Sequence, residues 1–93
     1  MLTKRGEYNY NDVMDFDDLI ELGWYFVATN KNQASNHSHA PRTDIDTRAY
    51  VFVLKGTLVN AYPFQLFLDA NVPCIYYRKG DVGENWVRVQ PMS

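Results

Sequence analysis

The chain has 93 residues and a formal net charge of −2 at pH 7, and 46% of its residues are apolar. That length leaves room for one domain, and an aromatic content of 15% excludes the composition of a disordered chain. A single cysteine excludes an internal disulfide framework and a cysteine-based zinc site. The net charge argues against nucleic-acid binding, because nucleic-acid modules usually carry a basic face. No apolar run is long enough for a membrane helix and polar residues follow Met1, so we expect neither membrane insertion nor a signal peptide.

The first predicted element is a short helix that follows a polar N-terminal arm. Residues 1–11 are expected to form an arm that either pairs with another segment or stays loose, and residues 12–93 are expected to form the domain. Asp15 is a suitable N-cap, and Gly23 stands where a C′ glycine belongs. One apolar face of this helix is predicted from residues spaced at i, i+3, i+4 and i+7: Phe16, Leu19, Ile20 and Gly23.

Beyond the helix, the chain predicts antiparallel strands interrupted by one long polar loop at residues 29–47. Aromatic and β-branched runs, or alternation of apolar and polar residues, predict strands at 24–28, 50–54, 62–69, 73–78 and 86–89. Pro63 indicates that its strand begins there or lies at an edge, and turns are expected at 69–71 and 79–83. The predicted fold is α+β: one short helix packed on a small antiparallel β-sheet in meander order, with a long polar loop.

The predicted core follows one phase of the alternating strands. Side chains at i and i+2 of a strand share a face, so a consistent apolar phase predicts the buried face. That phase comprises Trp24, Phe26, Tyr62, Phe64, Leu66, Leu68, Ile75 and Val87. Cys74 lies in a predicted strand and is expected to be an inert core thiol.

The polar loop at 29–47 is the candidate binding region. It holds almost no apolar side chain, and a connection of that length is usually functional or flexible. The candidate binding residues are Asn36, His37 and His39, with Tyr25 and Tyr50 at the borders of the loop as flat rings for sugar faces. The tyrosines as a group could instead pack in the core and in a subunit interface.

His37 and His39 also have the one spacing with metal-ligand character. In an extended segment both imidazoles would point to the same side, and Asp44 or Asp46 could add oxygen ligands. The alternative is a loop with two hydrated histidines, and we expect no metal and no other cofactor. No glycine-rich phosphate loop, nucleophile elbow or activated carboxylate pair is recognisable, so no enzymatic activity is predicted.

Three blocks of the sequence form a recognisable pattern. They are residues 17–27 with Asp-Leu and Gly-x-Tyr-x-Val, residues 50–54 as a hydrophobic strand, and residues 64–68, 75–78 and 85–89 with Gln, Tyr-x-Arg and Trp. In this order they resemble the knob-like domain near the ends of phage tail fibres and pyocin fibres. The resemblance covers residues 12–89, and Arg78 is expected to stack on Trp86 across the sheet.

The resemblance implies a structural module of a bacteriophage virion that is homotrimeric on a fibre. It implies no catalytic residues. Its expected partners are copies of itself, other virion proteins and a glycan or protein of the host surface, with no nucleic acid. The alternative is a small virus-encoded adaptor or inhibitor that binds a host protein through its acidic helix and exposed aromatic residues.

Overall fold

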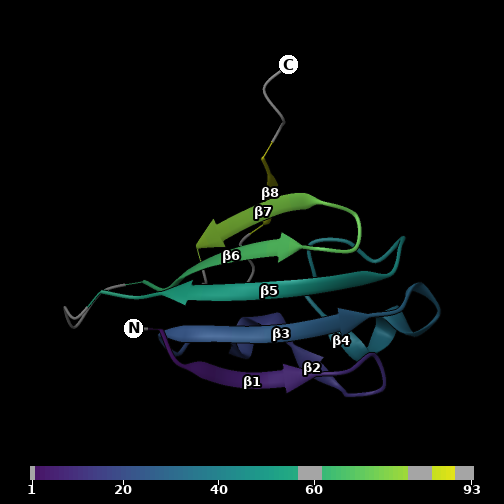
Figure 1. Cartoon of the computed structure of the whole chain (residues 1–93), viewed down its shortest axis with the longest axis horizontal. Helices are drawn as coiled ribbons and strands as arrows, with labels where there is room; N and C mark the ends of the chain where they lie inside the picture. Colours follow the sequence, from purple (N-terminus) through teal and green to yellow (C-terminus); the bar gives the residue numbers. More distant parts are fainter. Residues whose placement is uncertain (1, 57–61, 80–84, 90–93) are drawn as a thin grey trace.

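The computed structural model describes residues 2–56, 62–79 and 85–89, and its main feature is one six-stranded sheet. The strands lie in the spatial order β1-β3-β5-β6-β7-β8 (Figure 1). Their bounds are Lys4–Tyr8 for β1, Gly23–Thr29 for β3, Thr47–Leu54 for β5, Phe64–Asp69 for β6, Cys74–Lys79 for β7 and Val87–Arg88 for β8. A second sheet pairs β2 (Met14–Asp15) with β4 (His37–Ser38). Two short 3-10 helices are η1 (Phe16–Asp18) and η2 (Lys31–Asn36).

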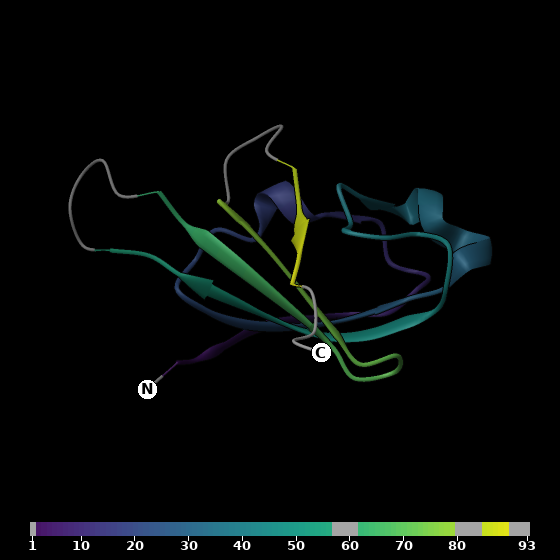
Figure 2. The same cartoon turned by 90° about the horizontal axis from the view of Figure 1, so that it is seen from above.

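The large sheet carries a covering layer on one side. Figure 2 shows η1 and η2 on the same side of the sheet, and β4 contacts both of them. From β3 to β8 all neighbouring strands are antiparallel, whereas β1 is parallel to β3. A turn joins β6 to β7 at residues 70–73, and most of the turn predicted at 79–83 lies outside the described residues.

The predicted α+β fold with a packed helix is wrong, because the chain is mostly β-structure and its large sheet is mixed. Asp15 does cap the helical segment, since its carboxylate accepts a hydrogen bond from the Asp17 N–H at 2.9 Å. The segment ends after one 3-10 turn, and Leu19 has left helical geometry at φ −85° and ψ 76°. A segment of one turn gains nothing from helix cooperativity, so the burial of Phe16 and Leu19 decides its conformation.

Gly23 begins β3 and does not end a helix. Its φ is +146°, and a Cβ atom there would lie 2.3 Å from the Thr3 carbonyl oxygen. That oxygen accepts a hydrogen bond from the Trp24 N–H at 2.9 Å. The glycine therefore permits a close approach of the N-terminal residues, and part of the predicted arm forms the edge strand β1.

The sheet buries the face opposite to the one predicted for the core. Tyr62 is 63% exposed and Val87 is 46% exposed, and none of the other predicted core residues is fully buried: Trp24, Phe26, Phe64, Leu66, Leu68 and Ile75. The buried apolar residues are Met14, Phe16, Leu19, Tyr25, Val27, Ala28, Ala49, Val51, Val53, Phe67 and Tyr76. Cys74 is half-buried against this core. The prediction failed because the alternate residues of β6 and β7 that are buried include polar side chains. In the sequence they therefore look like residues that face solvent.

The segment 29–47 belongs to the covering layer and is not a free loop. Thr29 and Thr47 close it at the sheet through a hydrogen bond between their buried hydroxyl groups. His37 is buried within it, and its Nε2 lies 3.1 Å from the Asn9 carbonyl oxygen. This segment without a run of apolar residues is thus held in place largely by hydrogen bonds.

Candidate functional site

A buried glutamine connects the covering layer to the sheet. Gln65 on β6 has no exposed surface, and its amide nitrogen donates to the Phe16 carbonyl at 2.7 Å and to the Leu19 carbonyl at 2.8 Å. Its amide oxygen accepts a hydrogen bond from Arg78 Nε at 2.7 Å. The polar side chain therefore satisfies backbone groups of η1 that face the core, where water cannot reach them.

Arg78 on β7 continues this arrangement. Its Nη2 lies 2.9 Å from Asp17 Oδ1, and the two side chains are only 1% and 7% exposed. Its guanidinium carbon lies 4.5 Å from the centre of the Trp86 ring, which confirms the predicted stacking. Trp86 in turn packs edge-on against Phe16 and Phe67, with ring centres about 6 Å apart in each pair.

The residues that carry much of the fibre-knob resemblance thus meet in one place. We call them the anchoring cluster: Asp17, Gln65, Arg78 and Trp86. They come from η1, β6, β7 and the segment before β8, and their contacts fix the covering layer on the sheet. A buried ion pair with this many hydrogen bonds specifies one arrangement of the layers.

A half-exposed histidine extends the anchoring cluster to the surface. Trp86 Nε1 donates to the His39 carbonyl at 2.7 Å, and His39 Nδ1 lies 2.7 Å from Asp15 Oδ1 and 3.3 Å from Asp17 Oδ2. The hydrogen bond to Asp15 and the charge of Asp17 raise the pKa of His39. Burial raises the pKa of Asp15, but hydrogen bonds from the Asp17 N–H and from His39 outweigh burial and lower it.

Asp15, Asp17 and His39 are close enough to share a metal ion, but Arg78 disfavours one. Its guanidinium already pairs with Asp17 and would repel a cation at this position. The predicted partnership of the two histidines is absent, because the backbone turns at His39, with φ +60°, while His37 faces Asn9. Among the described residues, no serine, threonine or cysteine hydroxyl or thiol is hydrogen-bonded to the His39 ring.

The aspartates proposed as additional metal ligands are engaged elsewhere. Asp44 accepts two hydrogen bonds from the Arg42 guanidinium at 2.9 Å each, and this contact lowers the pKa of Asp44. Asp46 accepts a hydrogen bond from the Lys31 N–H at 3.0 Å. The polar side chains of the segment 29–47 therefore organise the segment itself.

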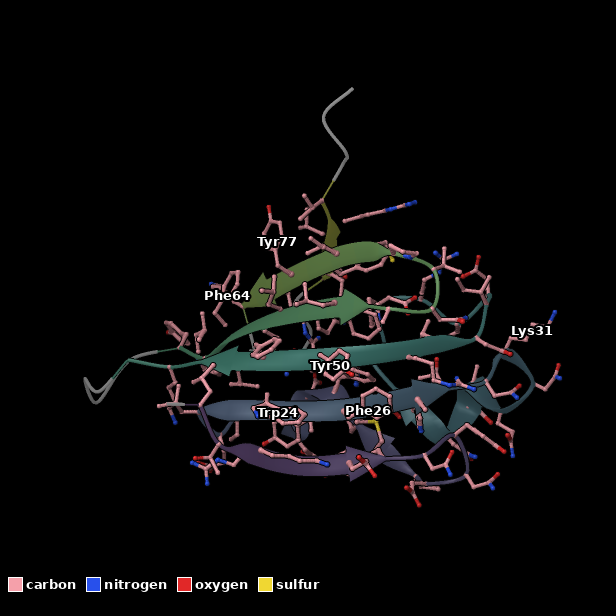
Figure 3. The ribbon with its side chains drawn as sticks, in the orientation of Figure 1. Trp24, Phe26, Lys31, Tyr50, Phe64 and Tyr77 are labelled. Carbon is pink, nitrogen blue, oxygen red and sulfur yellow. The ribbon has the colours of Figure 1, made fainter. Side chains whose placement is uncertain are left out.

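The five candidate binding residues do not form one site. Three of them lie in or beside the covering layer: Asn36, His37 and His39. Tyr25 is buried on the covered face of the sheet, whereas Tyr50 is exposed on the opposite face (Figure 3). Asn36 Nδ2 donates to the Tyr10 carbonyl at 3.2 Å, so this side chain also has a structural contact.

The strongest candidate for a functional surface is the sheet face opposite the covering layer. Directly paired residues share a face, so the strand registers place eight side chains in two rows across β3, β5, β6 and β7. The first row is Trp24, Phe52, Leu66 and Tyr77, and the second is Phe26, Tyr50, Leu68 and Ile75. We call these eight residues the aromatic face. Figure 3 shows its labelled rings on the side of the sheet that faces the viewer.

The aromatic face is a connected surface. The Tyr50 ring centre lies 6.1 Å from that of Trp24 and 5.2 Å from that of Phe26. At the other end of the face, Phe64 extends it by stacking on Tyr77 at 5.8 Å. The side chains support one another, so the surface is preorganised for contact.

Charged groups of the described residues border the aromatic face, among them Glu7, which pairs with Phe26, and Arg88, which lines a hollow with Leu68 and Ile75. Lys4 at the β1 edge places its Nζ 5.5 Å from the centre of the Trp24 ring. Lys79 at the far edge places its Nζ 5.3 Å from the centre of the Tyr62 ring. Arg48 donates to the Thr47 carbonyl at 2.8 Å, close to the end of the sheet.

Two hollows interrupt this surface at opposite ends of the second row. One, of about 280 Å³, lies beside Phe26 and is also lined by Ala28 and Arg48. The other, of about 450 Å³, lies beside Leu68 and Ile75. In the second row Tyr50 lies between Phe26 and Leu68, so its ring separates the two hollows.

The sequence analysis assigned five of the eight residues to the core: Trp24, Phe26, Leu66, Leu68 and Ile75. It named Tyr50 as a candidate binding residue. A signal for the correct reading exists in β3 and β5, where both phases are apolar. Tyr25, Val27 and Val51 alternate there with the aromatic face. Strands that are apolar on both sides are typical of sheets covered on both sides.

Comparisons with protein-family models, curated proteins and solved structures find no match to this chain. Within residues 2–56, 62–79 and 85–89, no helix has the length and apolar character needed to cross a bilayer.

Proposed function

We propose that this chain is a non-catalytic structural module of a bacteriophage appendage, a fibre knob that assembles with other protein chains. In this proposal it works in the virion as a homotrimer, without a cofactor. It contacts other virion proteins and displays one end to a glycan or protein of the host surface.

The observation that carries the proposal is the aromatic face. Monomeric soluble proteins rarely expose a contiguous apolar patch larger than a few hundred Å², and larger patches mark contact sites. Eight neighbouring positions without a charged side chain, four of them aromatic rings on β3 and β5, favour a surface that another protein covers. The anchoring cluster adds support, because residues behind the fibre-knob resemblance hold the covering layer on the sheet, which suits a structural module.

The proposed display surface is the exposed tip of the segment 29–47. Lys31, Asn32 and Ser35 on η2 are exposed, and Figure 3 shows Lys31 at one end of the molecule. Asn36 and His37 would then support the tip through their hydrogen bonds to the preceding chain. Short polar side chains on a fixed scaffold suit recognition of polar partners.

The second candidate is a small virus-encoded adaptor or inhibitor whose aromatic face binds a host protein. Its other expected contact, an acidic helix, is not present as a helix, and Asp15 and Asp17 already pair with His39 and Arg78. The adaptor would therefore depend on the aromatic face alone.

The mass of the purified chain in solution tests the proposal. A fibre knob should give about 32 kDa by light scattering, three times the chain mass of 10.8 kDa. A monomer at all accessible concentrations would contradict the fibre knob and favour the adaptor.

A further inference from the structure

We infer that the aromatic face is the surface buried between copies of this chain. This inference rests on the proposed function and specifies which face of the sheet the copies use to assemble. Two rows of side chains, centred on Tyr50, would pack against the same rows of the neighbouring copies. The anchoring cluster and the covering layer would remain on the outside of the assembly.

The chemistry of the aromatic face favours a permanent protein contact over a glycan. Sugar recognition combines a ring with several hydrogen-bonding groups that fix the hydroxyls. Among the eight positions, only Trp24, Tyr50 and Tyr77 carry a polar atom, and the other five side chains are wholly hydrocarbon. Such a surface offers many contacts for another apolar surface and few for a sugar.

The distribution of charge favours copies of this chain over an unrelated partner. Transient partners are steered and selected by complementary charges, whereas interfaces between identical chains are more apolar at their centre. None of the eight residues of the aromatic face is charged, and charged residues of both signs border it: Lys4, Glu7, Arg48, Lys79 and Arg88. This apolar centre with a charged margin resembles the interface of a permanent oligomer.

The size of the aromatic face suits self-association. Four strands at the usual spacing are about 19 Å wide, and six residues of strand are about 20 Å long. The planar footprint is therefore about 400 Å², and standing side chains and the neighbouring Leu54, Phe64 and Val87 enlarge it toward the roughly 800 Å² per partner of a standard interface.

Three copies can bury this face together around a threefold axis. A triangle with sides of about 19 Å has its centre about 5.5 Å from each side. Packed sheets lie about 10 Å apart, so each sheet fills about 5 Å with its side chains. Three aromatic faces turned inward thus fill a triangular core, and the hollows beside Phe26 and Ile75 offer space for side chains of the neighbours.

The polar residues on the covered face suggest why association would stabilise the chain. On β6 and β7 that face includes Gln65, Asp69 and Arg78, so the chain's own core contains fewer apolar side chains than its length would allow. A small domain with a limited core gains stability by burying a second apolar face.

Lysine substitutions on and off the aromatic face test the inference. Tyr50→Lys and Ile75→Lys change residues that are 42% and 39% exposed, and Val72→Lys and Val13→Lys are controls at 45% and 83% exposure outside the face. Sedimentation equilibrium at several chain concentrations measures the association of each variant. We expect each face substitution to weaken association at least about thirtyfold, as for loss of a central interface residue, and the controls to match the wild type.

Each outcome bears on the inference. A trimer that the face substitutions dissociate supports it together with the fibre knob. A dimer that they dissociate supports the face and contradicts the trimeric fibre. An oligomer that they leave intact overturns the inference while the fibre knob stands. A monomeric wild type overturns both, and a host protein or glycan would then be the occupant.

A second measurement guards against lysine variants that fail to fold. If copies bury the aromatic face, the urea midpoint of the wild type should rise with chain concentration over a hundredfold range, because association stabilises the folded chain. A midpoint independent of concentration contradicts the inference.

Discussion

On β6 and β7, the two faces of the large sheet reverse the usual pattern, in which the covered face is apolar and the exposed face is polar. The face that the chain covers holds Gln65, Asp69 and Arg78 on its two strands β6 and β7. The exposed face of the same two strands holds Phe64, Leu66, Leu68, Ile75 and Tyr77, with the charged Lys79 only at the end of β7, opposite Phe64. On β6 and β7 the hydrophobic alternation therefore follows the exposed face of the sheet and not the face that the chain buries.

The polar residues of the covered face form hydrogen bonds that offset much of the cost of their burial, although Asp69 Oδ2 is buried without a hydrogen-bond partner among the described residues. Asp69 Oδ1 accepts hydrogen bonds from the Arg48 N–H at 3.1 Å and the Asn71 N–H at 2.9 Å. Gln65 and Arg78 bond to each other and to the covering layer. A buried polar group costs little when its hydrogen bonds are made, so these strands can hold a structural network where the sequence pattern suggests solvent.

The largest expected difference between the faces comes from two phenylalanines of β6. Phe67→Ala, on the covered face, should lower the free energy of unfolding by about 3–5 kcal/mol because Phe67 is fully buried. Phe64→Ala removes an exposed ring, so it should lower the free energy of unfolding of the single chain by no more than about 1 kcal/mol. Any larger loss should come from weakened association and should therefore change with chain concentration. Urea unfolding at two chain concentrations measures both variants. A larger cost for Phe64→Ala at every concentration would restore the original assignment of the faces.

A smaller but more diagnostic effect is expected when the glutamine of the anchoring cluster becomes apolar. Gln65→Leu should destabilise the chain by about 2–3 kcal/mol, because the Phe16 and Leu19 carbonyls lose their buried donor. Gln33→Leu is the matched control, since the Gln33 side chain donates to the exposed Asn11 side chain, and its cost should stay within about 0.5 kcal/mol. Equal unfolding midpoints for the two variants would show that the polar network adds no stability.

The strands of the fold were largely predictable, and their covering was not. Aromatic and β-branched runs correctly predicted strands around Trp24, Val51 and Ile75. The helix failed because good capping by Asp15 fixes only where a helical turn begins, and nothing in the following residues sustains it. The strand β1 was missed because its pairing depends on Gly23, whose close contact with Thr3 is a tertiary feature.

The candidate site was predictable in its residues but not in its position. The resemblance selected Gln65, Arg78 and Trp86, and the stacking of the last two was derived correctly. The choice of face failed because the apolar alternation of β6 and β7 follows the exposed face, whereas the buried face holds Gln65, Asp69 and Arg78. His37 and His39 were grouped by their spacing, but the positive φ of His39 directs the two rings to different partners.

The smallest expected effect is a change in the pH dependence of stability at the outer end of the anchoring cluster. The His39 ring faces the carboxylates of Asp15 and Asp17, with Arg78 behind them, and its pKa is raised mainly by the hydrogen bond to Asp15. A raised pKa in the folded state means that the stabilisation is complete below the unfolded value of about 6.5 and is lost as the pH rises through the folded pKa. The lowered pKa of Asp15 acts oppositely, so its stabilisation is present above about 4 and is lost as the pH falls through the folded pKa.

His39→Asn tests this effect, because asparagine tolerates the positive φ at this position and does not titrate. The thermal midpoint of the wild type should fall relative to that of the variant between about pH 6 and pH 8, as the imidazole loses its proton. The effect should be small, because the His39 side chain is half-exposed and salt screens its ion pairs. Parallel midpoint curves over this range would show that His39 is not coupled to folding, and the anchoring cluster would then end at Asp17 and Trp86.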